Sequence, residues 1–88
     1  MNKERYTKKD AENALERLVT SIGGHMAKDS KDVGGYQLDY NTYYGGCVVH
    51  QIINEAGGVT LPFGMHRVKP YDFCQAVDFA LKFKALNS

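Results

Sequence analysis

The sequence contains no tryptophan, only two prolines and two cysteines, and no long apolar run. A membrane-spanning helix needs about 18 or more apolar residues in succession, so none is predicted. Two cysteines are too few for a disulfide framework. With 11 basic and 10 acidic residues, the net charge is +1, which gives no overall attraction to nucleic acid or to membrane lipids. Only a local basic patch would provide such attraction.

At 88 residues and 43% hydrophobic content, the chain has room for one domain, residues 1–88. A domain of this size buries about 60 to 65% of the surface of its unfolded chain, so a deep enclosed active site is not expected. The charged residues 1–9 lead into an amphipathic segment and not into an apolar signal core. We therefore expect a cytoplasmic protein with free thiols.

Two helices are predicted, one at each end of the chain. Residues 7–22 carry apolar side chains at intervals of three and four, with Thr7 and Asp10 spaced as a capping box and Gly23 placed to end the helix. Residues 70–86 begin with a proline, which suits a first helical position. Their apolar residues predict one broad buried face: Phe73, Cys74, Ala76, Val77, Phe79, Ala80, Leu81 and Phe83. Between the two helices, residues 23–35 are polar and aperiodic, which indicates a flexible loop.

Residues 36–63 have the sequence pattern of a three-stranded sheet. Residues 36–40 alternate aromatic or aliphatic with polar side chains, residues 47–54 are β-branched, and residues 59–63 alternate again up to the edge-favouring Pro62. If Tyr36, Leu38, Tyr40, Val59, Leu61 and Phe63 point inward, the open face of the sheet carries Gln37, Asp39, Thr60 and part of the second strand. The fold class is therefore α+β in the order helix, three strands, helix. We expect an antiparallel sheet with both helices packed on one face and the other face open to a partner.

Cysteine and histidine residues suggest two kinds of chemistry. Cys47 and His50 have the C-x-x-H spacing of a zinc ligand pair, with His25, His66 and Cys74 as further donors. Cys47, His50 or His66, and Asp39 also have the side chains of a thiol nucleophile, base and orienting acid. Buried structural cysteines explain both patterns more simply, and no known catalytic motif is present. We therefore predict no catalytic residues, no metal and no cofactor.

Tyrosines and basic residues suggest a binding surface. Four of the six tyrosines fall at 36, 40, 43 and 44, and tyrosine suits recognition of a protein or a stacked base, although core packing is the simpler explanation. His66, Arg67 and Lys69 place positive charge just before a helix N-terminus, where anions bind, although they also fit a solvated loop. The candidate binding residues are Asp39, Tyr40, Asn41, Tyr43, Tyr44, His66, Arg67 and Lys69.

The stretches YQLDYNTYYGG at 36–46 and NEAGGVTLPFG at 54–64, with Arg67 and the closing helix, resemble small tailed-phage and prophage accessory proteins of unknown function. The shared pattern, close to LDYN, YGG, NEGGGV and PFG, spans roughly residues 35–86, and Ala56 stands where that pattern has its first glycine. The resemblance concerns turns and strands, not catalytic groups. It implies a bacteriophage protein that acts in the host cytoplasm.

These observations favour a noncatalytic accessory protein, active as a homo-oligomer. We expect it to bind a host protein or a small signalling nucleotide, and to act as an inhibitor of a host process such as antiviral defence. The alternative is a small RNA- or DNA-binding domain, since double-stranded RNA-binding domains share this element order. A lysine run at the second helix, typical of those domains, is absent. A thiol or metal enzyme is the third hypothesis.

Overall fold

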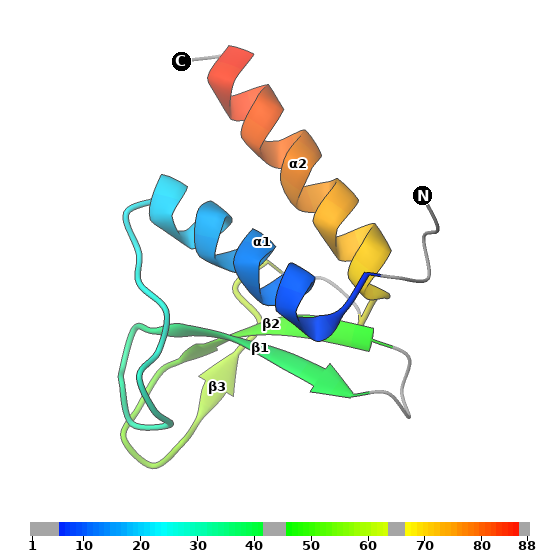
Figure 1. Cartoon of the computed structure of the whole chain (residues 1–88). Coiled ribbons are helices and arrows are strands. Elements are labelled where there is room, and N and C mark those ends of the chain that lie inside the picture. The colour runs from blue at the N-terminus through cyan, green and yellow to red at the C-terminus, as the bar shows by residue number, and fades with distance from the viewer. Residues whose placement is uncertain (1–5, 42–45, 64–66, 87–88) are drawn as a thin grey trace.

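The computed structural model describes residues 6–41, 46–63 and 67–86 and has the predicted α+β order (Figure 1). Its elements are helix α1 at Lys8–Ser21, strands β1 at Tyr36–Asn41, β2 at Gly46–Ile52 and β3 at Val59–Thr60, and helix α2 at Pro70–Leu86. The three strands form one antiparallel sheet in the order β1-β2-β3. The prediction of fold class is therefore confirmed. Within the described residues, neither helix is long and apolar enough to span a membrane.

Helix α1 begins and ends as its sequence predicts. The Asp10 amide donates to the Thr7 hydroxyl at 3.3 Å, and the Thr7 amide donates to the Asp10 carboxylate at 2.9 Å, which completes the capping box. At the other end Gly23 has a φ of +79°, and the Gly24 amide reaches back to the Val19 carbonyl at 2.9 Å. This is a Schellman-type ending, which stops the helix at the predicted glycine pair.

The segment predicted as a loop at residues 23–35 lies between α1 and β1 and is tied to the sheet by backbone hydrogen bonds. The Tyr36 amide donates to the His25 carbonyl at 3.0 Å, and the Gly34 amide donates to the Ile52 carbonyl at 2.8 Å. Asp32 organises the turn, because its carboxylate accepts from the Lys28 amide at 3.0 Å. The composition therefore predicts the absence of regular structure correctly, but it gives no sign of these contacts.

The sheet register places alternate side chains on two faces. Tyr36, Leu38 and Tyr40 pack against the core, as predicted. Thr60 pairs with Gln51, which also pairs with Tyr36, so Thr60 shares the helix-covered face. Val59 therefore lies on the opposite face and is 41% exposed, while Leu61 and Phe63 follow the two-residue β3 and are also exposed. An inward orientation of Val59 is therefore wrong, because a shift of one residue in phase reverses the face of every side chain in a strand. Phe63, although exposed, stacks on the Tyr36 ring with centroids 6.1 Å apart.

Both helices lie on the same side of the sheet and run in the same direction (Figure 1). Near their starts, the rings of Tyr6 and Tyr71 are 5.1 Å apart, and near their ends Lys84 donates to the Ser21 carbonyl. Helix α1 and helix α2 enclose the core with the inner face of β1 and β2. The cluster between the helices and the sheet consists of Ala11, Ala14, Leu15, Val19, Cys47, Val49, Phe73, Cys74 and Val77. Val48 and Ile52 are also buried, but on the other face of β2.

Helix α2 is narrower in its contacts than its sequence suggests. Phe73, Cys74 and Val77 are buried, but Ala76, Phe79, Ala80 and Phe83 are exposed, and the prediction of one broad buried face is wrong for these four. The helix packs along α1 and contacts the sheet at β2, so the side of α2 turned away from α1 has no covering layer in the described structure. Ile22, expected in the α1 stripe, is likewise 48% exposed, because it lies beyond the last helical turn.

Candidate functional site

The predicted site residues gather at one end of the sheet. Asp39, Tyr40 and Asn41 lie in the last half of β1, and Arg67 and Lys69 lie in the segment that leads into α2. Three other predicted site residues, Tyr43, Tyr44 and His66, lie outside the described residues. The two groups meet because Asn41 pairs with Gly46 at the start of β2, and the next residue, Cys47, forms an isolated bridge with Val68.

The neighbouring positions of β1 face opposite sides of the sheet, so the predicted site residues do not share one surface. Tyr40 is half-buried and packs against the core under the helices. Asp39 alternates with it and faces away from the helices. Lys69 is exposed, and the Phe73 amide donates to its carbonyl at 2.9 Å in the first bond of α2.

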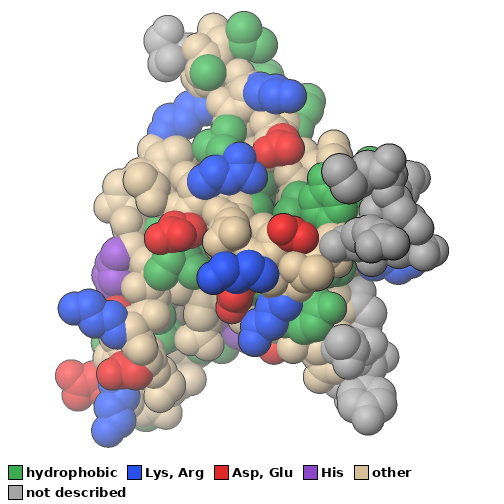
Figure 2. All heavy atoms as spheres, in the orientation of Figure 1, with side chains coloured by type: hydrophobic (Ala, Val, Ile, Leu, Met, Phe, Trp, Pro, Cys, Tyr) green, Lys and Arg blue, Asp and Glu red, His purple; other side chains and the backbone are tan. Residues whose placement is uncertain are grey.

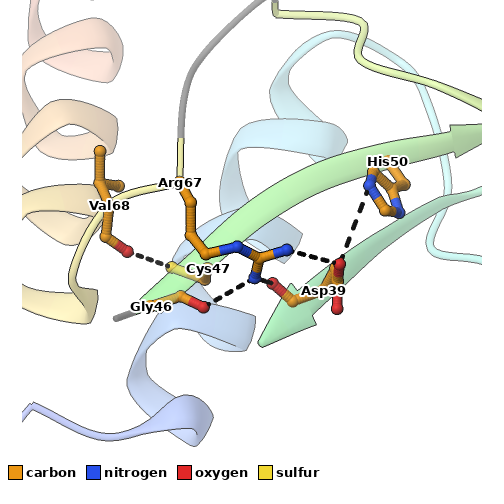
Figure 3. A network of polar contacts seen from close by, with 6 residues as sticks. All are labelled: Asp39, Gly46, Cys47, His50, Arg67 and Val68. Carbon is orange, nitrogen blue, oxygen red and sulfur yellow. Dashed lines mark hydrogen bonds and ion pairs between the residues drawn. The ribbon is translucent and has the colours of Figure 1, made fainter. Parts of the chain in front are cut away.

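Arg67 joins three parts of the chain through a contact we call the Asp39–Arg67 latch, formed by Asp39, Gly46 and Arg67. The guanidinium donates from Nη1 to the carbonyls of Asp39 and Gly46, at 3.1 and 3.0 Å, and from Nη2 to the Asp39 carboxylate at 2.9 Å. Figure 3 shows the side chain crossing β2 to reach β1. The latch therefore fixes the segment before α2 against both long strands.

The charges of the latch are only partly shielded from water. The Arg67 side chain is 25% exposed and the Asp39 side chain is 41% exposed. His50 Nε2 lies 4.0 Å from the same Asp39 oxygen, at the outer limit of an ion pair. An ion pair at this level of exposure contributes about 1 kcal/mol or less to stability. The main effect of this ion pair is therefore to hold the Arg67 cation in one position, and not to stabilise the fold.

Gly46 lets the segment before α2 approach β2 closely. It has a φ of +143°, a conformation that side-chain-bearing residues rarely adopt, and a Cβ there would overlap the carbonyl group of Val68. The sequence marked Gly46 only as part of a turn. No local pattern predicts this role of Gly46, because Val68, the residue that requires the glycine, lies 22 positions later in the chain.

Cys47 is a buried structural thiol in this arrangement. Its backbone exchanges two hydrogen bonds with Val68, at 2.7 and 3.0 Å, and its Sγ lies 3.4 Å from the Val68 carbonyl oxygen. Burial raises the pKa of the Cys47 thiol to about 11, and the nearby Cys74 thiol adds to the shift. Burial likewise raises the pKa of Cys74. Both groups therefore stay protonated at neutral pH, and a protonated thiol is a poor nucleophile and a poor metal ligand.

Cys47 and His50 lie on opposite faces of β2. Cys47 is opposite Tyr40 on the face that the helices cover, whereas His50 is opposite Gln37 on the other face. The C-x-x-H pair therefore cannot hold one metal ion, and His50 with Asp39 cannot serve Cys47 as a base and orienting acid. The same combination with His66 lies outside the described residues. Among the residues that the structure does describe, no group of three or more His, Cys, Asp or Glu side chains is placed to hold a metal.

Comparison of the chain with known proteins found no matching family model, no matching curated protein and no matching solved structure.

Proposed function

We propose that this chain is a noncatalytic binding protein that contacts a host protein or a small signalling nucleotide at the cationic edge formed by Arg67 and Lys69. One observation carries the proposal. The Arg67 guanidinium is held in a fixed position by three hydrogen bonds and still reaches the surface, two residues before the exposed Lys69. A cation that is already held in place loses little conformational entropy when it binds an anion.

The cationic edge suits a phosphate or a carboxylate. A guanidinium has five N–H donors, and the latch uses three hydrogen bonds from Arg67 among the described residues. Lys69 precedes Pro70, the first residue of α2, so the positive end of the helix dipole lies beside Lys69. An anionic group on a protein or nucleotide would therefore meet the exposed part of the Arg67 guanidinium, beside the Asp39 carboxylate that it already pairs with, and Lys69 at a helix N-terminus.

The buried thiols weigh against the enzyme hypothesis. Cys47, the candidate nucleophile, is in the core with a raised pKa, and its candidate partner His50 is on the other sheet face. The biological setting is interference with a host process such as antiviral defence. Its support is the sequence pattern of residues 35–86, which resembles that of phage accessory proteins.

A second candidate function is binding of double-stranded RNA or DNA. The observation that favours it is the arrangement of two helices on one side of a three-stranded antiparallel sheet, in the element order of double-stranded RNA-binding domains. Phosphate contacts make such binding fall steeply with salt. A fluorescence titration with a labelled RNA duplex at two salt concentrations tests this function. Affinity for the duplex should fall steeply with salt, whereas affinity for a specific protein or nucleotide partner depends far less on salt.

The proposal is tested by recovering the tagged full chain from bacterial cells and measuring the protein and nucleotide that remain bound to it. Lys69→Glu reverses one charge of the cationic edge, and Lys31→Glu makes the same change at another exposed lysine, in the loop before β1. We expect Lys69→Glu to lower the bound amount about tenfold, since charge-assisted contacts are among the strongest polar ones, while Lys31→Glu has no effect. Equal retention by both variants would contradict the site.

A further inference from the structure

The side of α2 that faces away from α1 carries an unusual set of exposed apolar residues. Phe79 is 70% exposed, Phe83 58% and Leu86 85%, and the two phenylalanine rings stack with centroids 6.2 Å apart. With Ala76 and Asp72, these residues are spaced by four, three, four and three positions. We call this stripe the outer face of α2 and define it as Asp72, Ala76, Phe79, Phe83 and Leu86.

The spacing of the outer face is that of a helix-pairing seam. Residues that recur every 3.5 positions stay on one side of a helix and interlock with a second helix. The buried residues Phe73 and Val77 lie on the other side of α2, so the core does not use this seam. In the view of Figure 2, hydrophobic side chains gather over the upper part of the molecule, where α2 ends.

The distribution of charge along α2 indicates what covers the seam. The first turn holds an acidic residue, Asp72, and the basic Lys82 lies about one turn before the end of α2, whereas Lys84 faces α1, where it donates to the Ser21 carbonyl. A second copy of α2 in antiparallel orientation places the acidic start of each helix beside the basic end of the other, and it opposes the two helix dipoles. A parallel copy would place like charges side by side.

The sizes of the seam residues fit the same antiparallel arrangement. If the two-fold axis passes between positions 77 and 78, the Phe79 ring of one copy lies over the small Ala76 of the other. The same register brings Asp72 of one copy within one position of Lys82 of the other. Large residues opposite small ones allow two helices to approach closely and pack without voids. We therefore propose that two copies of this chain associate through the outer faces of their α2 helices, in antiparallel orientation about a two-fold axis. The proposal concerns a different face from the cationic edge and does not depend on the proposed function.

The proposal is tested by analytical ultracentrifugation of the purified full chain without added ligand. The expected mass approaches twice the 9.8 kDa of one chain at about 0.1 mM protein. At this concentration a dimer with a dissociation constant in the micromolar range is almost fully formed. The double variant Phe79→Glu with Phe83→Glu is expected to sediment as a monomer with an unchanged circular dichroism spectrum, because both side chains are exposed. Leu61→Glu is the matched control, since Leu61 is 48% exposed outside α2, and it is expected to remain a dimer.

Orientation is tested by exchanging charges at the two ends of the seam. Asp72→Lys alone and Lys82→Glu alone are each expected to weaken the dimer, and the double exchange is expected to restore it. A dimer in which the double exchange restores nothing would overturn the antiparallel arrangement. A wild-type chain that is monomeric at about 0.1 mM would overturn self-association. Self-association would also be overturned if the monomer bound a different protein through the outer face of α2, and the double variant Phe79→Glu with Phe83→Glu released that protein.

Discussion

At the scale of the residue, Gly46 shows how one position without a side chain determines where another segment lies. Its φ of +143° and the closeness of the Val68 carbonyl allow no Cβ, and the Arg67 guanidinium binds its carbonyl oxygen. The Cys47–Val68 bridge follows immediately. Because all of these contacts depend on the same close approach, a methyl group at Gly46 would push the segment before α2 off the sheet.

Gly46→Ala is therefore expected to lower the free energy of unfolding by about 3 kcal/mol, from backbone strain together with the steric overlap. Gly57→Ala is the matched control, because Gly57 also has a positive φ, +92°, but a Cβ there meets no atom within 4 Å. The control is expected to cost about 1 kcal/mol from backbone strain alone. Urea denaturation of both variants measures the difference, and equal costs would show that the close approach at Val68 is not structurally important.

The Asp39–Arg67 ion pair is expected to have a modest coupling energy. A double-mutant cycle with Asp39→Asn and Arg67→Gln should give about 0.5 to 1 kcal/mol, because the side chains are 41% and 25% exposed. The Arg17–Asp78 pair is a matched comparison at 3.4 Å, with side chains 57% and 43% exposed, and its coupling should be smaller. A larger coupling at Arg17–Asp78 would contradict the importance given to the latch.

Cys47 is expected to react slowly with iodoacetamide at pH 8 in the folded protein and rapidly once the chain is unfolded, because its pKa is raised to about 11 by burial. The same shift affects stability. The folded state holds the thiol proton more tightly than the unfolded state, so stability falls as pH rises from the ordinary thiol pKa towards 11. Cys47→Ala should make this alkaline loss less steep. Rapid labelling of Cys47 in the folded protein would contradict its burial.

At the scale of the element, the best predicted parts are those whose signals are local. The capping box at Thr7, the glycine pair after α1 and the proline at the start of α2 all lie within a few residues of the boundaries they define, and both helix positions are confirmed. Strand β3 was predicted through Phe63 but contains two residues, because pairing with β2 and not side-chain alternation decides where a strand ends. Exposure of Phe79 was missed because helical periodicity does not show how many neighbours a helix has.

The α1 cap gives a prediction at this scale. Thr7→Ala removes the hydroxyl that accepts from the Asp10 amide, and we expect a loss of about 1 kcal/mol in the free energy of unfolding. Thr20→Ala makes the same chemical change at an exposed position inside α1 and should be neutral or slightly stabilising, since alanine favours helix. Thermal unfolding followed by circular dichroism compares the two. An equal effect of the two substitutions would contradict the capping role of Thr7.

At the scale of the whole molecule, the shape follows from how α2 is attached. The radius of gyration is 13.1 Å, against about 12 Å expected for a compact domain of this length, and the extents are 41, 38 and 20 Å. Figure 1 shows α2 rising away from the sheet. An extended helix of this kind provides surface for association without enlarging the core, which agrees with the proposed pairing of two copies.

The sequence predicts the fold class well and the candidate site only in part. Asp39 and Arg67 were each identified as binding residues, but their pairing with one another was not foreseen, because they are 28 positions apart and meet only when β1, β2 and the segment before α2 come together. The separation of Cys47 from His50 depends on sheet register, which composition does not specify. Tyr43, Tyr44 and His66 lie outside the described residues, so their predicted roles stay predictions.

The central claim, that this is a binding protein with a cationic edge at Arg67 and Lys69, is tested most directly by native mass spectrometry of the protein purified gently from bacterial cytoplasm. This measurement reports the number of chains and the mass of anything bound to them at once. We predict a complex that carries additional mass, either a few hundred daltons of nucleotide or a host protein, and loses it in Lys69→Glu but not in Lys31→Glu. A chain that carries no additional mass, or additional mass that Lys69→Glu leaves in place, would contradict the claim.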